Sequence, residues 1–134
     1  MGIYNFFNIQ EIFSYCSSLN YPLLANWDVS NVQNFEWALR SIPTNHNLSS
    51  WNVSSSTNLQ GIFSNSFAFD VSSWDVSNVT NLQYFCLGNS GMTGFENWNV
   101  SNVTNTTYAF FASSPVMDLS NWNLSSLTNA SRMF

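Results

Sequence analysis

Apolar and polar residues alternate around five tryptophans spread along the chain. Each tryptophan is followed two residues later by valine or leucine and preceded three residues earlier by another large apolar residue. Alternation with a period of two predicts a short strand that points the tryptophan and the valine inward. The five tryptophans recur at intervals of 24, 23, 24 and 24 residues: Trp27, Trp51, Trp74, Trp98 and Trp122.

Downstream of each alternating segment the apolar period changes. Leu59, Ile62 and Phe63 are spaced i, i+3, i+4, and the same spacing recurs at Leu82 and at Thr106. This spacing puts apolar side chains on one face of a helical turn, and the Thr or Asn before it is a suitable N-cap. We therefore predict one helical turn per repeat.

A repeat of 23–24 residues is too short to bury its apolar face alone, so neighbouring repeats must cover one another. The pattern predicts a β-rich solenoid, a leucine-rich-repeat-like right-handed coil stack with one short parallel strand plus a helical turn per repeat. Residues 1–134 form a single domain of about six coils. The first and last coils are incomplete, and Met1 occupies the tryptophan position of the first.

The residues one and three places after each tryptophan point outward in this scheme. They are small and polar, and coils about 4.8 Å apart would line them up into a regular face. We predict that this face meets a partner. Its residues are Asp28, Asn52, Asp75, Asn99 and Asn123, with Ser30, Ser54, Ser77, Ser101 and Ser125.

Two segments, Leu48-Ser-Ser-Trp-Asn-Val-Ser and Val71-Ser-Ser-Trp-Asp-Val-Ser-Asn-Val-Thr-Asn-Leu, carry a family resemblance. They are similar to the repeat of the BspA-like group of leucine-rich-repeat surface proteins. The resemblance implies a solenoid displayed on a cell or particle surface, in adhesion or another interaction. The chain departs from the family pattern in its shorter units and in keeping the repeat's cysteine only as Cys16.

Charge narrows the range of partners. The chain has two arginines, Arg40 and Arg132, no lysine and a net charge of −5. So few cations cannot neutralise many phosphates, which disfavours nucleic acid and anionic lipid. The opening residues lack the basic stretch and apolar run of a signal peptide, and no segment has the apolar length of a membrane span. We still expect a cell-surface, extracellular or virion-associated location from the resemblance.

Most candidate chemical groups have a structural interpretation. We expect the tryptophan column to fill the core rather than stack on sugars or bases, and Trp37, which lies off that column, to be the better exposed contact. An asparagine recurs seven residues after each tryptophan, and we expect its amide to cap turns and bond to the backbone of the next coil. These asparagines are Asn34, Asn58, Asn81, Asn105 and Asn129.

Ionisable and reactive residues are too scattered to predict an active site. Cys16 and Cys86 belong to coils three apart, so we expect free thiols rather than a disulfide. His46 has no partner at metal-ligand spacing, and weak calcium binding at Asp70, Asp75 or Asp118 lacks an oxygen cage. The eight Asn-x-Ser/Thr triplets leave glycosylation open. We predict no catalytic residue, no metal and no cofactor.

The leading hypothesis is a non-enzymatic repeat scaffold that presents a surface for protein–protein interaction or adhesion at a cell or particle surface. One alternative is a structural component of a virion or sheath, and a second is binding to ice or another crystal surface. The expected partner is a protein or a neighbouring subunit, and a glycan remains open. The apolar pair Met133 and Phe134 at the last repeat is the candidate assembly end.

Overall fold

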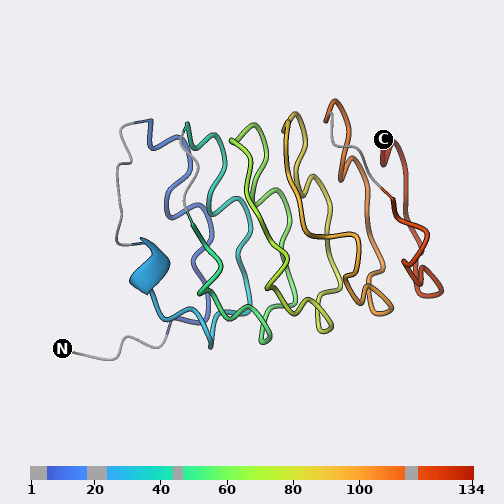
Figure 1. The fold of residues 1–134 in the computed structure, drawn as a ribbon, viewed down its shortest axis with the longest axis horizontal. Helices are drawn as coiled ribbons and strands as arrows, with labels where there is room; N and C mark the ends of the chain where they lie inside the picture. Colours follow the sequence, from blue (N-terminus) through green and yellow to red (C-terminus); the bar gives the residue numbers. More distant parts are fainter. Residues whose placement is uncertain (1–5, 18–23, 44–46, 114–117) are drawn as a thin grey trace.

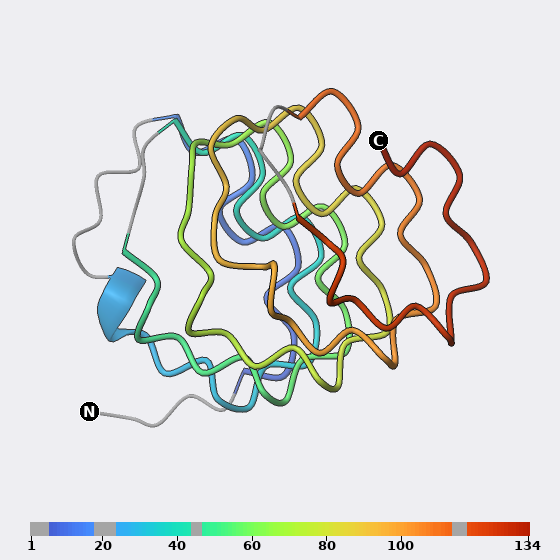
Figure 2. The ribbon, with the colours of Figure 1, turned by 45° about the vertical axis from the view of Figure 1, so that its right-hand side comes forward.

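The computed structural model describes residues 6–17, 24–43, 47–113 and 118–134. Within these residues one regular element is present, the 3-10 helix η1 at Leu24–Asn26. The rest of the described chain consists of turns, bends and irregular segments. Successive repeats lie side by side along the long axis, from the first described repeat to the last (Figures 1 and 2).

The predicted β-rich solenoid is wrong, because the described residues contain no β-strand and no sheet. Turns flank the predicted strand on both sides: the Trp51 amide donates to the Leu48 carbonyl (3.0 Å), and the Ser56 amide to the Val53 carbonyl (2.8 Å). The extended part is therefore too short to pair as a strand. The tryptophan and the valine two residues later both point inward, as in a strand, but the extended segment is only three residues long.

Backbone pairing between repeats occurs elsewhere, at the asparagine seven residues after each tryptophan. There, isolated parallel bridges join each repeat to the next. They connect Asn8 to Asn34, Asn34 to Asn58, Asn58 to Asn81, Asn81 to Asn105 and Asn105 to Asn129. A further bridge joins Asp70 to Thr93. Each bridge is single because the chain turns immediately after it.

The predicted helical turn is also wrong. Gly61 and Asn65 have left-handed backbone angles, with φ of 61° and 53°, which interrupt a right-handed helix. Three overlapping turns replace it: the amides of Ile62, Ser64 and Ser66 donate to the carbonyls of Leu59, Gly61 and Phe63, at 3.3, 3.0 and 3.1 Å. A left-handed residue third in a four-residue turn is typical of a type II turn.

Alternate amides in these turns donate to the following repeat. Leu59, Gly61 and Phe63 donate to the carbonyls of Asn81, Gln83 and Phe85, at 3.1, 2.8 and 3.0 Å. An α-helix would have used these amides within the chain segment itself. The apolar spacing was read correctly, since Leu59, Ile62 and Phe63 are all fully buried. The observed turns place these three residues on one side of the chain, as a helical turn would have done.

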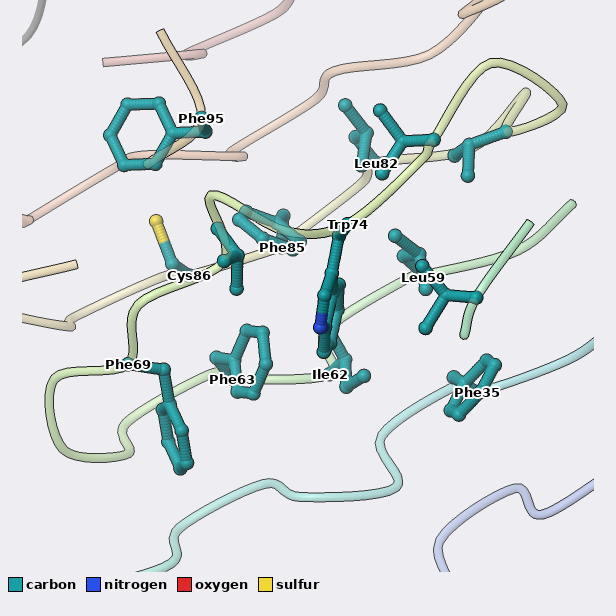
Figure 3. Packing of buried hydrophobic residues seen from close by; sticks show 14 of the residues in the cluster. Phe35, Leu59, Ile62, Phe63, Phe69, Trp74, Leu82, Phe85, Cys86 and Phe95 are labelled. Atoms are coloured by element: carbon teal, nitrogen blue, oxygen red, sulfur yellow. The ribbon is translucent and has the colours of Figure 1, made fainter. Parts of the chain in front are cut away.

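The inner tryptophan column was predicted correctly. Trp51, Trp74, Trp98 and Trp122 are buried, with exposed fractions of 2%, 4%, 5% and 8%. Trp27 is partly buried and packs against Phe13, with ring centroids 5.0 Å apart. Figure 3 shows the Trp74 side chain directed into the core beside Phe63 and Ile62. The Trp74 and Phe63 ring centroids are 5.5 Å apart.

Each buried indole also links its repeat to the preceding one. The Nε1–H groups of Trp51, Trp74, Trp98 and Trp122 donate to the carbonyls of Leu24, Leu48, Val71 and Phe95, at 2.7, 3.2, 3.2 and 2.9 Å. A buried indole donor without a partner would be costly. The tryptophan therefore fills the core and satisfies its polar atom with a single neighbouring carbonyl.

Candidate interaction surface

The first column of the predicted interaction face is exposed in the structure. Its members are Asp28, Asn52, Asp75, Asn99 and Asn123. Each side-chain Oδ1 accepts a hydrogen bond from the amide two residues later, at 3.0 to 3.2 Å. This is an Asx turn, in which a side-chain oxygen replaces a backbone acceptor. These residues therefore shape the backbone as well as facing solvent.

The serine column of the same face is less accessible. Ser30, Ser54, Ser77 and Ser101 are half-buried, and Ser125 is exposed. The hydroxyls of Ser30 and Ser101 donate to Asp28 Oδ1 (2.6 Å) and Asn99 Oδ1 (2.8 Å). The face thus exists as a row of paired side chains in which the acidic or amide residue is the more exposed partner.

Hydrogen bonds from the neighbouring serines lower the pKa of the exposed carboxyls. The Ser30 hydroxyl and then the Ser30 amide lower the pKa of Asp28 below its ordinary value. The Ser77 amide and then its hydroxyl do the same for Asp75. Outside the predicted face, the Ser120 hydroxyl and amide lower the pKa of Asp118. Donors to a carboxylate favour its charged form, so the face stays negative in mildly acidic solution.

An open cleft of about 460 Å³ lies on this face between the Trp74 and Trp98 repeats. Asp75 and Asn99 from the predicted column line it, together with Glu96 and Asn97. Glu96 Oε2 accepts the Gly94 amide at 3.1 Å. The described lining holds carboxylates, amides and the edges of two buried indoles, and no basic residue. Such a cleft suits a neutral or cationic polar group better than an anion.

The asparagine column seven residues after tryptophan caps turns, as predicted, but its amides bond to side chains of the preceding repeat and not to the backbone of the next. In all six repeats, from Asn8 to Asn129, Oδ1 accepts the amide two residues later at 2.8 to 3.1 Å. Several amide groups also reach the preceding repeat. Asn58 Nδ2 donates to Asn34 Oδ1 (2.9 Å), and Asn81 Nδ2 donates to Gln60 Oε1 (3.0 Å).

The candidate assembly end divides into a buried and an exposed residue. Met133 is buried, and Phe134 is 66% exposed. The Phe134 ring stacks on that of Phe110, with centroids 5.9 Å apart. Leu124, which occupies the valine position of the same repeat, is 37% exposed. Whether another chain covers this end stays a prediction.

The two cysteines are free thiols, Cys16 partly buried and Cys86 buried. Burial raises the pKa of the Cys86 thiol to about 12, so the reactive thiolate is suppressed at neutral pH. Within the described residues, no group of three or more His, Cys, Asp or Glu side chains could hold a metal ion. His46 and Met1 lie outside the described residues.

Sequence reasoning identified Trp37 and missed the surface to which it belongs. Trp37 is half-buried, and its ring lies 5.5 Å from that of Tyr84, which in turn lies 5.4 Å from Tyr108. All three residues stand ten places after a tryptophan of the inner column. Aligning that one column would have revealed the shared position, although not that the rings meet across a glycine.

Comparison with known proteins shows the family. Two overlapping stretches, residues 3–94 and 71–134, match the family model described as Mycoplasma protein of unknown function, DUF285. No curated protein and no solved structure matches the chain. In the part of the chain that the structure describes, no helix has the length and hydropathy needed to cross a bilayer. Because the two matches together cover nearly all of it, the chain belongs to the DUF285 family, which occurs in BspA-like surface repeat proteins.

Proposed function

We propose that the chain is a non-enzymatic scaffold that presents a regular surface to a protein partner, in adhesion at a cell or particle surface. The observation that carries this proposal is the repetition of exposed side chains in register. Each of the five repeats with an inner tryptophan contributes one Asx-turn residue to one row, from Asp28 to Asn123, and one bridge asparagine to a second row. Repeat arrays of this kind commonly use an extended surface for binding.

Two further observations support the proposal. The family occurs in BspA-like surface repeat proteins, which favours surface display and adhesion. The side-chain oxygens of the Asx-turn row and the backbone amides of the serine row are engaged in turns, which favours a rigid presenting surface over a reacting one. Rigid, preorganised surfaces lose less conformational entropy when they bind.

Adhesion can be tested with beads coated with the purified chain and incubated with cultured epithelial cells. We expect the beads to adhere more than beads coated with an unrelated acidic protein of similar size. Mild trypsin treatment of the cells should abolish adhesion, and glycosidase treatment should leave it intact. Adhesion that survives trypsin and is lost with glycosidase would contradict a protein partner.

A role as a structural component of a virion or sheath is the second proposal, and the exposure of Phe134 favours it. Sedimentation of the purified chain over a range of concentrations distinguishes the two. Ordered association that weakens when Phe134 is changed to serine would favour the structural role. Bead adhesion by a chain that stays monomeric would favour the presenting scaffold.

A further inference from the structure

A row of aromatic side chains lies outside the core, ten residues after the inner tryptophans. The rings of Trp37 and Tyr84 are 5.5 Å apart and inclined by 30°, and those of Tyr84 and Tyr108 are 5.4 Å apart and inclined by 20°. All three residues are half-buried. Their rings therefore form a continuous stack that solvent reaches at the ring edges.

The backbone under this row is unusual for such bulky residues. Trp37, Tyr84 and Tyr108 have φ of 55°, 55° and 56°, in the left-handed region where glycine is favoured. Gly61 holds the equivalent position between Trp37 and Tyr84, with φ of 61°. A Cβ at Gly61 would overlap the Trp37 ring. The absence of a side chain at Gly61 therefore lets the Trp37 ring extend over the Gly61 repeat to Tyr84.

Both arginines of the chain lie on this row. The Arg40 guanidinium lies 4.8 Å from the Trp37 ring centroid and 4.9 Å from that of Tyr15. The Arg132 guanidinium lies 5.6 Å from the Tyr108 centroid, and its Nη1 donates to the Tyr108 hydroxyl at 3.0 Å. We call these six residues the aromatic–arginine strip: Tyr15, Trp37, Arg40, Tyr84, Tyr108 and Arg132.

Neither guanidinium forms an ion pair within the described residues, which include all seven acidic side chains. Arg40 Nε is also buried without a hydrogen-bond partner. Glu11 holds the row's position in the first repeat, with φ of 56° and its amide bonded to the Glu36 carbonyl at 2.9 Å, and the Glu36 carboxylate accepts Gln60 Nε2 at 3.1 Å. The only positive side chains of an acidic protein thus lie on one partly exposed row, and neither pairs with a carboxylate.

We propose that the aromatic–arginine strip docks an extended, acidic segment of a partner protein. This proposal rests on the protein-binding function proposed above and assigns it to a different row from the Asx-turn face. Tryptophan, tyrosine and arginine are the residues that dominate binding energy at protein interfaces. Arginine pairs with carboxylates through two parallel hydrogen bonds, which supplies both affinity and orientation.

The stacking geometry favours a peptide over a sugar chain. A sugar that stacks on an aromatic residue needs an open ring face, whereas Tyr84 lies between Trp37 and Tyr108, and Tyr108 between Tyr84 and Arg132. Ring edges and the Tyr108 hydroxyl remain for apolar side chains and backbone groups. Two cations are too few for a nucleic-acid backbone.

The spacing of the arginines sets the spacing of the carboxylates they would bind. Repeats joined by backbone hydrogen bonds are about 4.8 Å apart, so the two guanidiniums, about four repeats apart, are separated by roughly 20 Å. An extended chain covers this distance in about six residues. Two acidic residues about six positions apart in one partner segment would therefore match the strip.

An array of synthetic nonapeptides tests the proposal. Two glutamates are placed two to eight positions apart in a serine and tyrosine background, and each peptide has a counterpart with both glutamates replaced by glutamine. We expect the purified chain at low salt to bind the six-residue spacing about tenfold more tightly than its glutamine counterpart. The preference should weaken as salt is added.

Variants locate the binding. Arg132→Gln should weaken glutamate-peptide binding more than Arg40→Gln, because acidic residues belong to the Arg40 and Tyr15 repeats. The double variant should bind glutamate and glutamine peptides equally, and Arg132→Lys should keep part of the preference. Asp118→Asn, an exposed position outside both the strip and the Asx-turn face, is the matched control and should change nothing, since Asn47 makes the same turn at the equivalent position. The tryptophan-fluorescence melting temperature confirms that each variant is folded.

Three results would overturn the proposal: equal binding of glutamate and glutamine peptides, an unchanged double variant, or tighter binding of a heparin or hyaluronan oligosaccharide than of any peptide. If beads coated with the wild type and beads coated with the strip variants adhere to cells equally well, the scaffold function stands and the strip is not the surface that contacts the cells. If the peptides bind and the beads do not adhere, the strip stands without the adhesive role.

Discussion

The protein contains two aromatic columns that differ in what holds them in place. In the inner column Trp74 is 4% exposed, packs against Phe63 and donates its indole hydrogen to the preceding repeat. In the outer column Tyr84 is half-buried, lies between two other rings and adopts a left-handed backbone angle. The inner ring is fixed by the core on all sides, whereas the outer ring is held by its stacking partners on a strained backbone.

This difference shows that residue type alone does not decide a role in a repeat protein. Burial of a large ring stabilises the fold because it removes apolar surface from water and leaves no cavity. A half-exposed ring contributes much less, and a left-handed angle offsets part of that contribution. Aromatic residues at such a position are better explained by contact with something outside the chain.

The largest expected effect separates the two columns directly. Trp74→Ala should lower the free energy of unfolding by about 3–5 kcal/mol, because it empties a core site and removes a hydrogen bond between repeats. Tyr84→Ala should lower it by less than about 1.5 kcal/mol, the worth of the ring stacking. Urea denaturation followed by tryptophan fluorescence measures both. Equal losses would show that the outer ring is part of the core.

The bridge asparagines come next in expected effect. Asn81→Ala should cost about 1–3 kcal/mol, because the Gln83 amide loses its acceptor and Gln60 Oε1 loses its donor. Asn81→Asp is the matched control, since it keeps the acceptor and loses only the donor, and should cost less. A melting temperature unchanged by Asn81→Ala would mean that solvent replaces both bonds.

Gly61→Ala should have a smaller effect on stability and a specific effect on the outer column. The left-handed angle and the overlap with the Trp37 ring should together cost about 1–2 kcal/mol. The displaced indole should also move away from Tyr84, which near-ultraviolet circular dichroism can detect. Retention of the wild-type aromatic signal would show that Trp37 does not depend on the space above Gly61.

The smallest effect is expected on the Asx-turn face. Asp75→Asn should change the free energy of unfolding by less than about 0.5 kcal/mol at neutral pH, since asparagine makes the same turn at Asn52 and Asn99. The pKa of Asp75 is lowered from its ordinary value of 3.8. Its contribution to stability is therefore full above that value and is lost as the pH falls through the lower folded-state pKa.

Acid titration of the melting temperature checks this sign. The wild type should lose stability below about pH 4 more steeply than Asp75→Asn, which has no carboxyl to protonate at this position. Identical acid profiles would show that the Ser77 hydrogen bonds do not distinguish the charged from the neutral side chain.

Much of the candidate surface could be read from the sequence. The outward position of Asp28, Asn52 and Asp75 followed from alternation with the tryptophans. The turn-capping role of Asn81 followed from its recurrence and its chemistry. The aromatic–arginine strip could not be read in this way, because its contacts join residues from five repeats. Arg40 and Arg132 are 92 positions apart in the sequence and share one row only in the folded chain.

The sequence alone determined how the repeats are aligned with one another. A period of 23–24 residues fixes which side chains share a column, because each repeat must be covered by its neighbours. It also determined that the tryptophan column is buried, because the tryptophans alternate with polar residues that face solvent. The sequence also determined family membership, since the two matches to the family model together span nearly the whole repeat array.

Only the tertiary structure decided the path of the backbone between these columns. Apolar spacing of i, i+3, i+4 is satisfied equally by a helical turn and by two turns with left-handed residues, such as Gly61 and Asn65. Amides that a helix would have used locally bind the carbonyls of the next repeat instead. Side-chain spacing is a local property, whereas the choice of hydrogen-bond acceptor depends on which repeat lies alongside.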